Sequence, residues 1–173
     1  VYPVDMPIQP PLSLKYPLVV KPLMGDGSEG IANASLVTTN QELIDRTTFI
    51  HSTFAQPAIA EEFIEGRELY ISVVGNTRLT VLPPREFHYG NGEDNGPVLA
   101  TYRVKWNETY QNKWKLSFGF GDVTKSTARK IARLCKAAYR ILRIHDYGRF
   151  DIRLTPENKV YILEANPNPD IAK

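Results

Sequence analysis

The sequence predicts an α+β protein with two lobes, and three observations support this prediction. Two short apolar runs around a polar turn predict a β-hairpin over residues 147–166. Apolar residues at steps of three and four predict a long helix over residues 124–144. The acidic stretch of residues 61–68 separates these elements from the N-terminal strands and indicates a linker between two lobes.

The composition narrows the class of protein. The chain has 173 residues, a formal net charge of +2 and one cysteine, Cys135. A single cysteine excludes an internal disulfide and a multi-cysteine metal site, and it permits a reducing cytoplasm. The small net charge does not support nucleic-acid or membrane binding, and no apolar run is long enough to cross a bilayer. Both ends of the chain are proline-rich and the first residue is not Met, so we expect a piece of a longer protein.

The first predicted strand ends at a lysine. Residues 18–20 are apolar and Lys21 follows them. Residues 24–30 come next with three glycines and Ser28, so their backbone amides can approach an anion closely. The glycine spacing matches neither a P-loop nor a Rossmann fingerprint, and a simple hairpin turn is the alternative.

A helix is predicted after a short strand at residues 35–38. Thr39 and Glu42 have the spacing of a capping box, with Thr39 as the N-cap. One face of this helix is apolar and is expected to carry Leu43, Ile44 and Ile50.

The acidic stretch could hold a purine. A strand at residues 58–60 runs into it, and another at residues 69–74 leaves it. Backbone groups of residues 62–64 could bind the edge of the base, with a carboxylate on the ribose. An exposed acidic turn is the alternative, and it would be preferred if this stretch stood alone.

Residues 85–122 are mostly polar, and we expect them to be irregular. A strand at residues 80–82 ends at two prolines before them. A loop of this length in a compact domain is usually functional. Within it, Tyr102 and Trp106 lie on either side of Lys105, and core packing is the commoner fate of such aromatic rings.

The predicted helix over residues 124–144 has an apolar stripe and a basic remainder. Thr124 or Ser126 would cap its N-terminus. Cys135 lies on the stripe and is expected to be a buried structural thiol. The basic side is expected to be solvated, because no aromatic residues lie among the basic ones to stack on the bases of a nucleic acid. The stripe consists of Ile131, Leu134, Cys135, Ala138, Ile141 and Leu142.

Closing the hairpin with Thr155 opposite Val160 defines its register. One face then carries two directly opposed pairs, which are Asp151 with Glu164 and Arg149 with Asn166. The other face is apolar and is expected to face a core with Phe150, Ile152, Leu154, Tyr161, Leu163 and Ala165.

Two directly opposed carboxylates repel each other, which normally costs stability. Asp151 opposite Glu164 therefore indicates a cation between them. Their carboxylate oxygens and the amide oxygen of Asn166 suit Mg²⁺ carrying the phosphates of a nucleotide. The alternative is a solvated hairpin whose acids are neutralised by Arg149 and Arg153.

Three motifs occur in a fixed order between Tyr16 and Pro169. They are Val-Lys-Pro at 20–22 with the Gly-Ser loop, Glu-Phe-Ile-Glu-Gly-Arg-Glu at 62–68, and Gly-Arg-Phe-Asp at 148–151 followed by Leu-Glu-Ala-Asn-Pro at 163–167. Together they resemble the ATP-grasp domain of the D-alanine–D-alanine ligase family. The resemblance implies two lobes of antiparallel sheets and helices that grip a nucleotide, here a smaller lobe over residues 1–62 and a larger lobe over residues 63–173.

The resemblance implies roles for the matching residues. The phosphates of ATP would be contacted by Lys21, Lys105 and Ser28. The adenine would be lined by Glu61, Glu62, Phe63, Ile64 and Leu163, and the ribose would be held by Glu68. Two Mg²⁺ ions, with Mn²⁺ as another metal that the site could accept, would be bound by Asp151, Asn166 and a bridging Glu164.

The implied reaction joins a small carboxylate or amino-acid substrate to an amine through an acyl phosphate. The metals and lysines would neutralise the transferring phosphoryl group, and Arg149 would stabilise the oxyanion formed when the amine attacks. Trp106, and the Pro-Asn-Pro-Asp that follows Asn166, depart from D-alanine ligases and put D-alanine specificity in question.

The resemblance implies that the family's N-terminal substrate domain and C-terminal tail would lie outside the given sequence. We expect the missing domain on a longer cytoplasmic polypeptide, with a homodimer left open and no nucleic-acid or membrane partner. The alternative function is a non-catalytic ATP-binding or regulatory ATP-grasp module.

Overall fold

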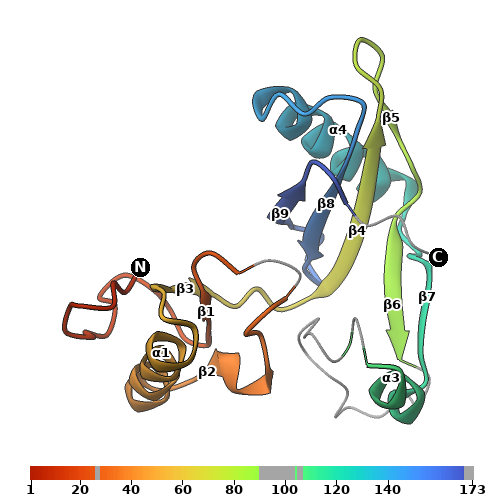
Figure 1. Ribbon diagram of the computed structural model, residues 1–173. Helices are drawn as coiled ribbons and strands as arrows, with labels where there is room; N and C mark the ends of the chain where they lie inside the picture. Colours follow the sequence, from red (N-terminus) through yellow and green to blue (C-terminus); the bar gives the residue numbers. More distant parts are fainter. Residues whose placement is uncertain (26–27, 90–103, 105–106, 170–173) are drawn as a thin grey trace. The chain divides into compact units, whose positions relative to one another are not determined.

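The computed structural model describes residues 1–25, 28–89, 104 and 107–169 (Figure 1). The predictions for Tyr102, Lys105 and Trp106 lie outside these described residues.

The chain divides into two compact units. One consists of Val1–Phe63 and Tyr89–Leu116, and the other consists of Ile64–His88 and Ser117–Lys173. Antiparallel sheets and helices build both units, which confirms the α+β class. The lobe boundary between residues 62 and 63 stays a prediction.

In the first unit, helix α1 (Asn40–Phe54) packs on a three-stranded antiparallel sheet. The strand order is β2-β1-β3, with β1 at Leu18–Pro22, β2 at Leu36–Val37 and β3 at Ala58–Glu62. A 3-10 turn, η1 (Asn33–Ser35), precedes β2. The core between sheet and helix consists of Leu18, Val20, Val37, Leu43, Ile50, Ala58 and Ala60.

Helix α1 begins at its predicted cap, and the carboxylate of Glu42 binds mainly to the residue before the cap. Thr39 Oγ1 accepts a hydrogen bond from the backbone N–H of Glu42 at 3.2 Å. Glu42 Oε2 accepts from the backbone N–H and the hydroxyl of Thr38, at 2.6 and 2.9 Å, and the backbone N–H of Thr39 contributes less to lowering the pKa of this carboxyl. Both groups of Thr38 thus donate to the same oxygen of the Glu42 carboxylate.

The second unit contains a sheet of order β7-β6-β4-β8-β9, in which β5 also pairs with β4. Helix α4 (Lys125–Ile141) packs on one face of this sheet (Figure 1). The strands are β4 (Arg67–Val74), β5 (Thr80–Val81), β6 (Arg85–Tyr89), β7 (Leu116–Phe120), β8 (Tyr147–Leu154) and β9 (Val160–Asn166). The core under α4 includes Leu69, Ile71, Val73, Phe150 and Ile152.

Helix α4 also begins at its predicted cap, with Thr124 Oγ1 accepting from the backbone N–H of Thr127 at 3.2 Å. Its buried side chains recur every four residues and are Thr127, Ile131, Cys135 and Tyr139. Three residues of the predicted apolar stripe do not face the core, since Leu134, Ile141 and Leu142 are exposed. The helix ends at Ile141, and the last turn reaches the sheet through Tyr139, whose hydroxyl donates to the carbonyl oxygen of Gly75 at 2.9 Å.

Residues 85–122 are more regular than predicted. Their described part contains β6, a short helix α3 (Glu108–Trp114) and β7. Asn107 caps α3, because its Oδ1 accepts from the backbone N–H of Tyr110 at 2.7 Å. The prediction failed although Leu116, Phe118 and Phe120 alternate with Ser117 and Gly119, because this run is only five residues long, contains a glycine that is typical of loops, and lies at the end of the sheet.

The β8–β9 hairpin contains a β-bulge that the predicted register lacks. Leu154 pairs with Val160, so the predicted pairing of Thr155 with Val160 is wrong. The register shifts at Asp151/Ile152. Ile152 pairs with Ile162 and Asp151 pairs with Glu164, so Leu163 is an extra residue in β9 without a partner on β8. Beyond this bulge, the side chains of β9 that faced one side of the sheet face the other. Its core-facing residues are Val160, Ile162 and Ala165, whereas Tyr161 and Leu163, which were predicted to be buried, are exposed.

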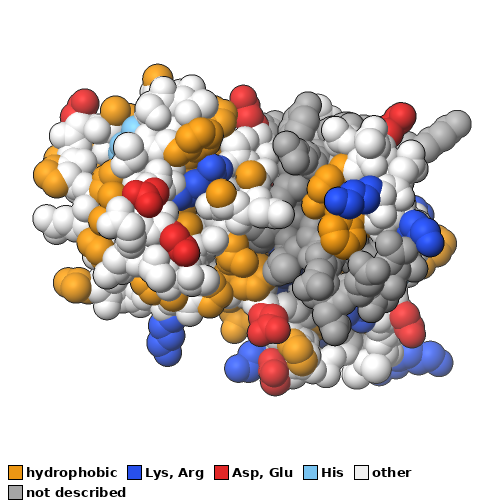
Figure 2. All heavy atoms as spheres, turned by 90° about the horizontal axis from the view of Figure 1, so that it is seen from below, with side chains coloured by type: hydrophobic (Ala, Val, Ile, Leu, Met, Phe, Trp, Pro, Cys, Tyr) orange, Lys and Arg blue, Asp and Glu red, His pale blue; other side chains and the backbone are white. Residues whose placement is uncertain are grey.

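In the described part of the chain, no helix has both the length and the apolar character that crossing a membrane requires. Figure 2 shows one face of the molecule, where acidic and basic side chains are interspersed with apolar ones.

Candidate functional site

Strands β8 and β9 place four of the predicted residues on neighbouring positions. Asp151 is directly opposite Glu164, and Arg149 is directly opposite Asn166. Both predicted pairs are confirmed, because the bulge lies beyond them toward the turn. Asp151 is only 3% exposed, whereas Glu164 is open to solvent.

Arg149 makes a bidentate ion pair with Asp151 on its own strand. Arg149 Nε lies 2.7 Å from Asp151 Oδ1, and its NH2 donates to Oδ2 at 3.1 Å. Burial by itself would lower the pKa of Arg149, but the hydrogen bond and the charge of Asp151 outweigh it and raise the pKa above its ordinary value. The guanidinium therefore stays positively charged beside the carboxylate pair.

The hairpin offers hard oxygen donors for a cation. Asn166 Nδ2 is buried and makes no hydrogen bond, although an unpaired buried amide normally costs free energy. No cluster of three or more His, Cys, Asp and Glu residues within the described ranges could hold a metal, so a site here needs Asn166 and water beside Asp151 and Glu164. Each oxygen of Asp151 has a second lone pair that Arg149 leaves available. The carboxylates of Asp151 and Glu164, the amide oxygen of Asn166 and water are therefore a donor set that fits Mg²⁺.

Arg153 does not neutralise the hairpin acids. Its NH2 lies 3.0 Å from Glu68 Oε2 on β4, and its NH1 donates to the carbonyl oxygen of Gly66 at 2.8 Å. The alternative prediction for the hairpin is therefore right for Arg149, which pairs with Asp151, and wrong for Arg153.

Tyr70 completes this polar face and was missed by the sequence analysis. It lies directly opposite Asp151, and its hydroxyl donates to Glu68 Oε1 at 2.9 Å. The Arg149 guanidinium carbon lies 5.4 Å from the centre of its ring. Burial, followed by the charges of Glu68 and Asp151, raises the pKa of Tyr70 well above 10.0. The alternation of β4 could have placed Tyr70 on the face of Glu68, since the two are separated by one residue.

The predicted residues of the first unit lie at the ends of β1 and β3. Lys21 Nζ is 2.6 Å from Glu61 Oε2, so the structure brings a predicted phosphate contact beside a predicted adenine contact. Glu62 Oε1 accepts from the backbone N–H of Lys15 at 2.8 Å. The backbone N–H of Phe63 donates to the carbonyl oxygen of Pro17 at 2.9 Å.

The described end of the glycine-rich loop is held by an arginine that the sequence analysis missed. Arg46, in α1, donates from its guanidinium to the carbonyl oxygen of Gly30, and to Ser35 Oγ at 2.9 Å. It is 8% exposed, and this burial lowers its pKa. The signal in the sequence was its place between Leu43 and Ile50 on the buried face of the helix. Ser28, within the loop, has a φ of 67°.

Two further predicted adenine contacts belong to the second unit. Ile64 is partly buried. Leu163 is 46% exposed because the bulge turns it away from the core, which leaves its side chain free to contact a ligand.

Comparison with known proteins supports the resemblance. Residues 6–173 match the family described as "D-ala D-ala ligase C-terminus". The chain is 31% identical over 159 residues to the uncharacterized protein y4sG of Sinorhizobium fredii, and the match covers 92% of this chain and 45% of that protein. It is 27% identical over 168 residues to the D-alanine–D-alanine ligase of Bordetella avium, covering 92% of this chain and 46% of the ligase.

A solved structure has the same fold. The D-alanine–D-alanine ligase from Bacillus anthracis complexed with ATP aligns with a TM-score of 0.62 at 20% sequence identity. The alignment covers 89% of this chain and 42% of that ligase. This chain thus spans less than half the length of the proteins it matches.

Proposed function

Because the chain belongs to the family of D-alanine–D-alanine ligase C-terminal domains and has the ATP-grasp fold, we propose that it is the ATP-binding part of an ATP-dependent carboxylate–amine ligase. The observation that carries this proposal is the directly opposed pair of Asp151 and Glu164, with Arg149 and Asn166 beside it. Opposed carboxylates are unfavourable in a bare hairpin and favourable around a cation that carries nucleotide phosphates.

Asp151, Glu164 and Asn166 would hold Mg²⁺, which supplies charge neutralisation at the phosphates when it is bound. We propose that these three residues would hold two ions, and that Mn²⁺ could substitute for Mg²⁺. Glu164 is exposed and would be free to adapt to a bound metal, whereas Asp151 is fixed by Arg149.

Arg149 is proposed to stabilise the oxyanion that forms when an amine attacks an acyl phosphate. Its raised pKa keeps it charged throughout the working pH range of a protein. Asp151 and the ring of Tyr70 orient its guanidinium. A fixed donor of this kind stabilises developing charge without reorganising during the reaction.

The nucleotide contacts are proposed residue by residue. The phosphates would be bound by Lys21, Ser28 and Lys105, and the ribose would be bound by Glu68. The adenine would be bound by Glu61, Glu62, Phe63, Ile64 and Leu163. A small carboxylate or amino acid and an amine would be the other substrates. We propose a cytoplasmic location for the protein, because ATP is supplied there. We also propose that further domains on a longer polypeptide complete the substrate site, and that the protein forms a homodimer.

Calorimetric titration with a non-hydrolysable ATP analogue, with Mg²⁺ or with EDTA, tests the nucleotide site. We expect binding that depends on Mg²⁺ and is lost in Glu164→Gln. Glu157→Gln, in the turn of the same hairpin, is the matched control and should bind as the wild type does. Absence of binding under both conditions would contradict the proposal.

The alternative is a module that binds ATP without catalysis. ADP release that requires both a carboxylate and an amine would exclude it, and loss of this release in Arg149→Lys with binding retained would assign the arginine. Binding without ADP release in any substrate mixture would favour the alternative.

A further inference from the structure

Glu68 is held from both sides. Its Oε1 accepts a hydrogen bond from the Tyr70 hydroxyl at 2.9 Å, and its Oε2 lies 3.0 Å from NH2 of Arg153. Tyr70 is 5% exposed and Arg153 is 6% exposed, so both donors are buried. Two donors on two different oxygens restrict the rotation of a carboxylate that would otherwise be mobile.

Arg153 also holds the backbone that precedes Glu68. Its NH1 donates to the carbonyl oxygen of Gly66 at 2.8 Å. Gly66 follows Ile64 by two residues, and Ile64 ends the stretch proposed to line the adenine edge. One guanidinium therefore positions both the carboxylate proposed for the ribose and the backbone next to the residues proposed for the base.

We propose that Arg153 and Tyr70 are positioning residues that set Glu68 to accept hydrogen bonds from both hydroxyls of a ribose, and that they thereby make the site selective for ribonucleotides over deoxyribonucleotides. This inference rests on the proposed function, because it requires Glu68 to bind the sugar of the nucleotide.

The chemistry of the carboxylate supports this role. A carboxylate has about four lone-pair positions, and the two donors from Arg153 and Tyr70 occupy only two of them. The remaining positions can accept two vicinal hydroxyls without displacing either donor. A carboxylate already fixed in this orientation loses little conformational entropy when the sugar binds, which favours affinity.

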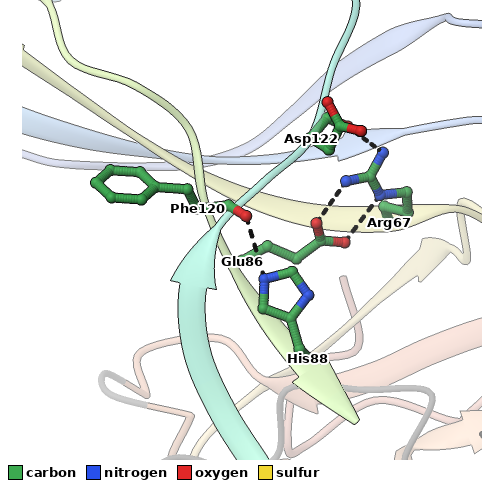
Figure 3. A network of polar contacts seen from close by, with 5 residues as sticks. All are labelled: Arg67, Glu86, His88, Phe120 and Asp122. Atoms are coloured by element: carbon green, nitrogen blue, oxygen red, sulfur yellow. Dashed lines mark hydrogen bonds and ion pairs between the residues drawn. The ribbon is translucent and has the colours of Figure 1, made fainter. Parts of the chain in front are cut away.

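A second arginine–glutamate pair in the same sheet provides a matched control. Arg67 donates to Glu86 at 2.9 Å through Nε and at 2.5 Å through NH2 (Figure 3). Arg67 and Leu69 alternate with Glu68 along β4, so this pair lies on the opposite face of the sheet from Glu68. It has the same chemistry as the Arg153–Glu68 pair but no part in the proposed site.

The test compares the affinities of ADP, 2′-deoxy-ADP and 3′-deoxy-ADP, with Mg²⁺, for wild type, Arg153→Lys, Tyr70→Phe and Arg67→Lys. We expect wild type to prefer ADP over each deoxy form by about tenfold, which is the usual effect of one hydrogen bond to a charged group. Arg153→Lys and Tyr70→Phe should weaken ADP binding several-fold and deoxy-ADP binding much less, so the preference falls. Arg67→Lys should keep the full preference even if its melting temperature drops.

Three results would overturn the inference. An unchanged preference in both Arg153→Lys and Tyr70→Phe would mean that the two residues only stabilise the fold. A wild-type protein that binds ADP without any sugar preference would remove Glu68 from the ribose and leave the proposed function intact. Failure of wild type to bind any of the three nucleotides would instead contradict the proposed function itself. Tyr70→Phe keeps the aromatic ring, so it provides a test even if Arg153→Lys does not fold.

Discussion

Gly66 is a single residue whose backbone conformation admits no ordinary side chain. Its φ is +146°, and an added Cβ would lie 2.4 Å from the carbonyl oxygen of Leu154. We expect Gly66→Ala to lower the free energy of unfolding by about 1–3 kcal/mol, as strained backbone positions do. Urea denaturation measures this. The exposed neighbour Glu65→Ala should change stability by less than about 0.5 kcal/mol, and equal effects of the two variants would contradict the argument.

Cys135 gives a second prediction at the residue scale. It lies fully buried on the sheet-facing side of α4, and burial raises the pKa of its thiol to about 12. Because the thiolate is the reactive form, we expect no reaction with a disulfide reagent in the native protein and one reactive thiol per chain in denaturant. Rapid labelling of the native protein at neutral pH would show that the thiol is accessible.

At the residue scale, the sequence predicts which residues are neighbours when they belong to one local element such as a hairpin. Asp151, Glu164, Arg149 and Asn166 follow from alternation within one hairpin. Arg153 does not, because its partner Glu68 lies on another strand, and strand neighbours cannot be derived from a single alternating run.

The bulge in β9 gives the sharpest test at the scale of an element. Ile162 packs against the core, whereas the next residue, Leu163, is exposed. We expect Ile162→Ala to cost about 1–3 kcal/mol of stability and Leu163→Ala less than about 0.5 kcal/mol. In nucleotide titrations the order should reverse, with Leu163→Ala weakening the binding of an ATP analogue. A larger stability loss in Leu163→Ala than in Ile162→Ala would restore the unbulged register.

The start of α1 predicts a pH effect. The hydrogen bond from the Thr38 backbone N–H, and then that from its hydroxyl, hold the pKa of Glu42 below 4.5. A lowered folded-state pKa contributes stability above the unfolded-state value, and this is lost as the pH falls through the folded-state value. The melting temperature of Glu42→Gln should therefore lie slightly below that of wild type at pH 7, and the gap should close below about pH 4.5.

Asp45→Asn, on the same helix but outside its first turn, is the control. A gap between wild type and Glu42→Gln that widens on acidification would contradict the sign of this linkage.

Helices were predicted correctly where a capping residue or a regular spacing of apolar residues indicated them. Thr39 and Thr124 both begin the helices that the sequence indicated. The buried stripe of α4 was misjudged, because the prediction followed apolar residues at steps of three and four, whereas the buried residues recur at steps of four and include Thr127 and Tyr139. Strands β6 and β7 were missed because each is only five residues long and lies in a stretch that is mostly polar, which indicated a loop.

For the whole molecule, the sequence predicts the α+β class and the ligase family through three motifs in order, and the comparisons confirm both. It does not determine the amine or the carboxylate, because less than half of the length of the relatives is represented here. The proposed site residues stay predictions until a nucleotide is bound.

The central claim is that Asp151 and Glu164 act together on a metal that carries the nucleotide. The most direct measurement is the affinity of a non-hydrolysable ATP analogue as a function of Mg²⁺ concentration, for wild type, Asp151→Asn, Glu164→Gln and the double variant. We predict that each single substitution abolishes most of the gain that Mg²⁺ gives to wild type and that the double variant loses little more, because coupled residues are not additive. Full retention of the Mg²⁺ effect in both single variants would contradict the account.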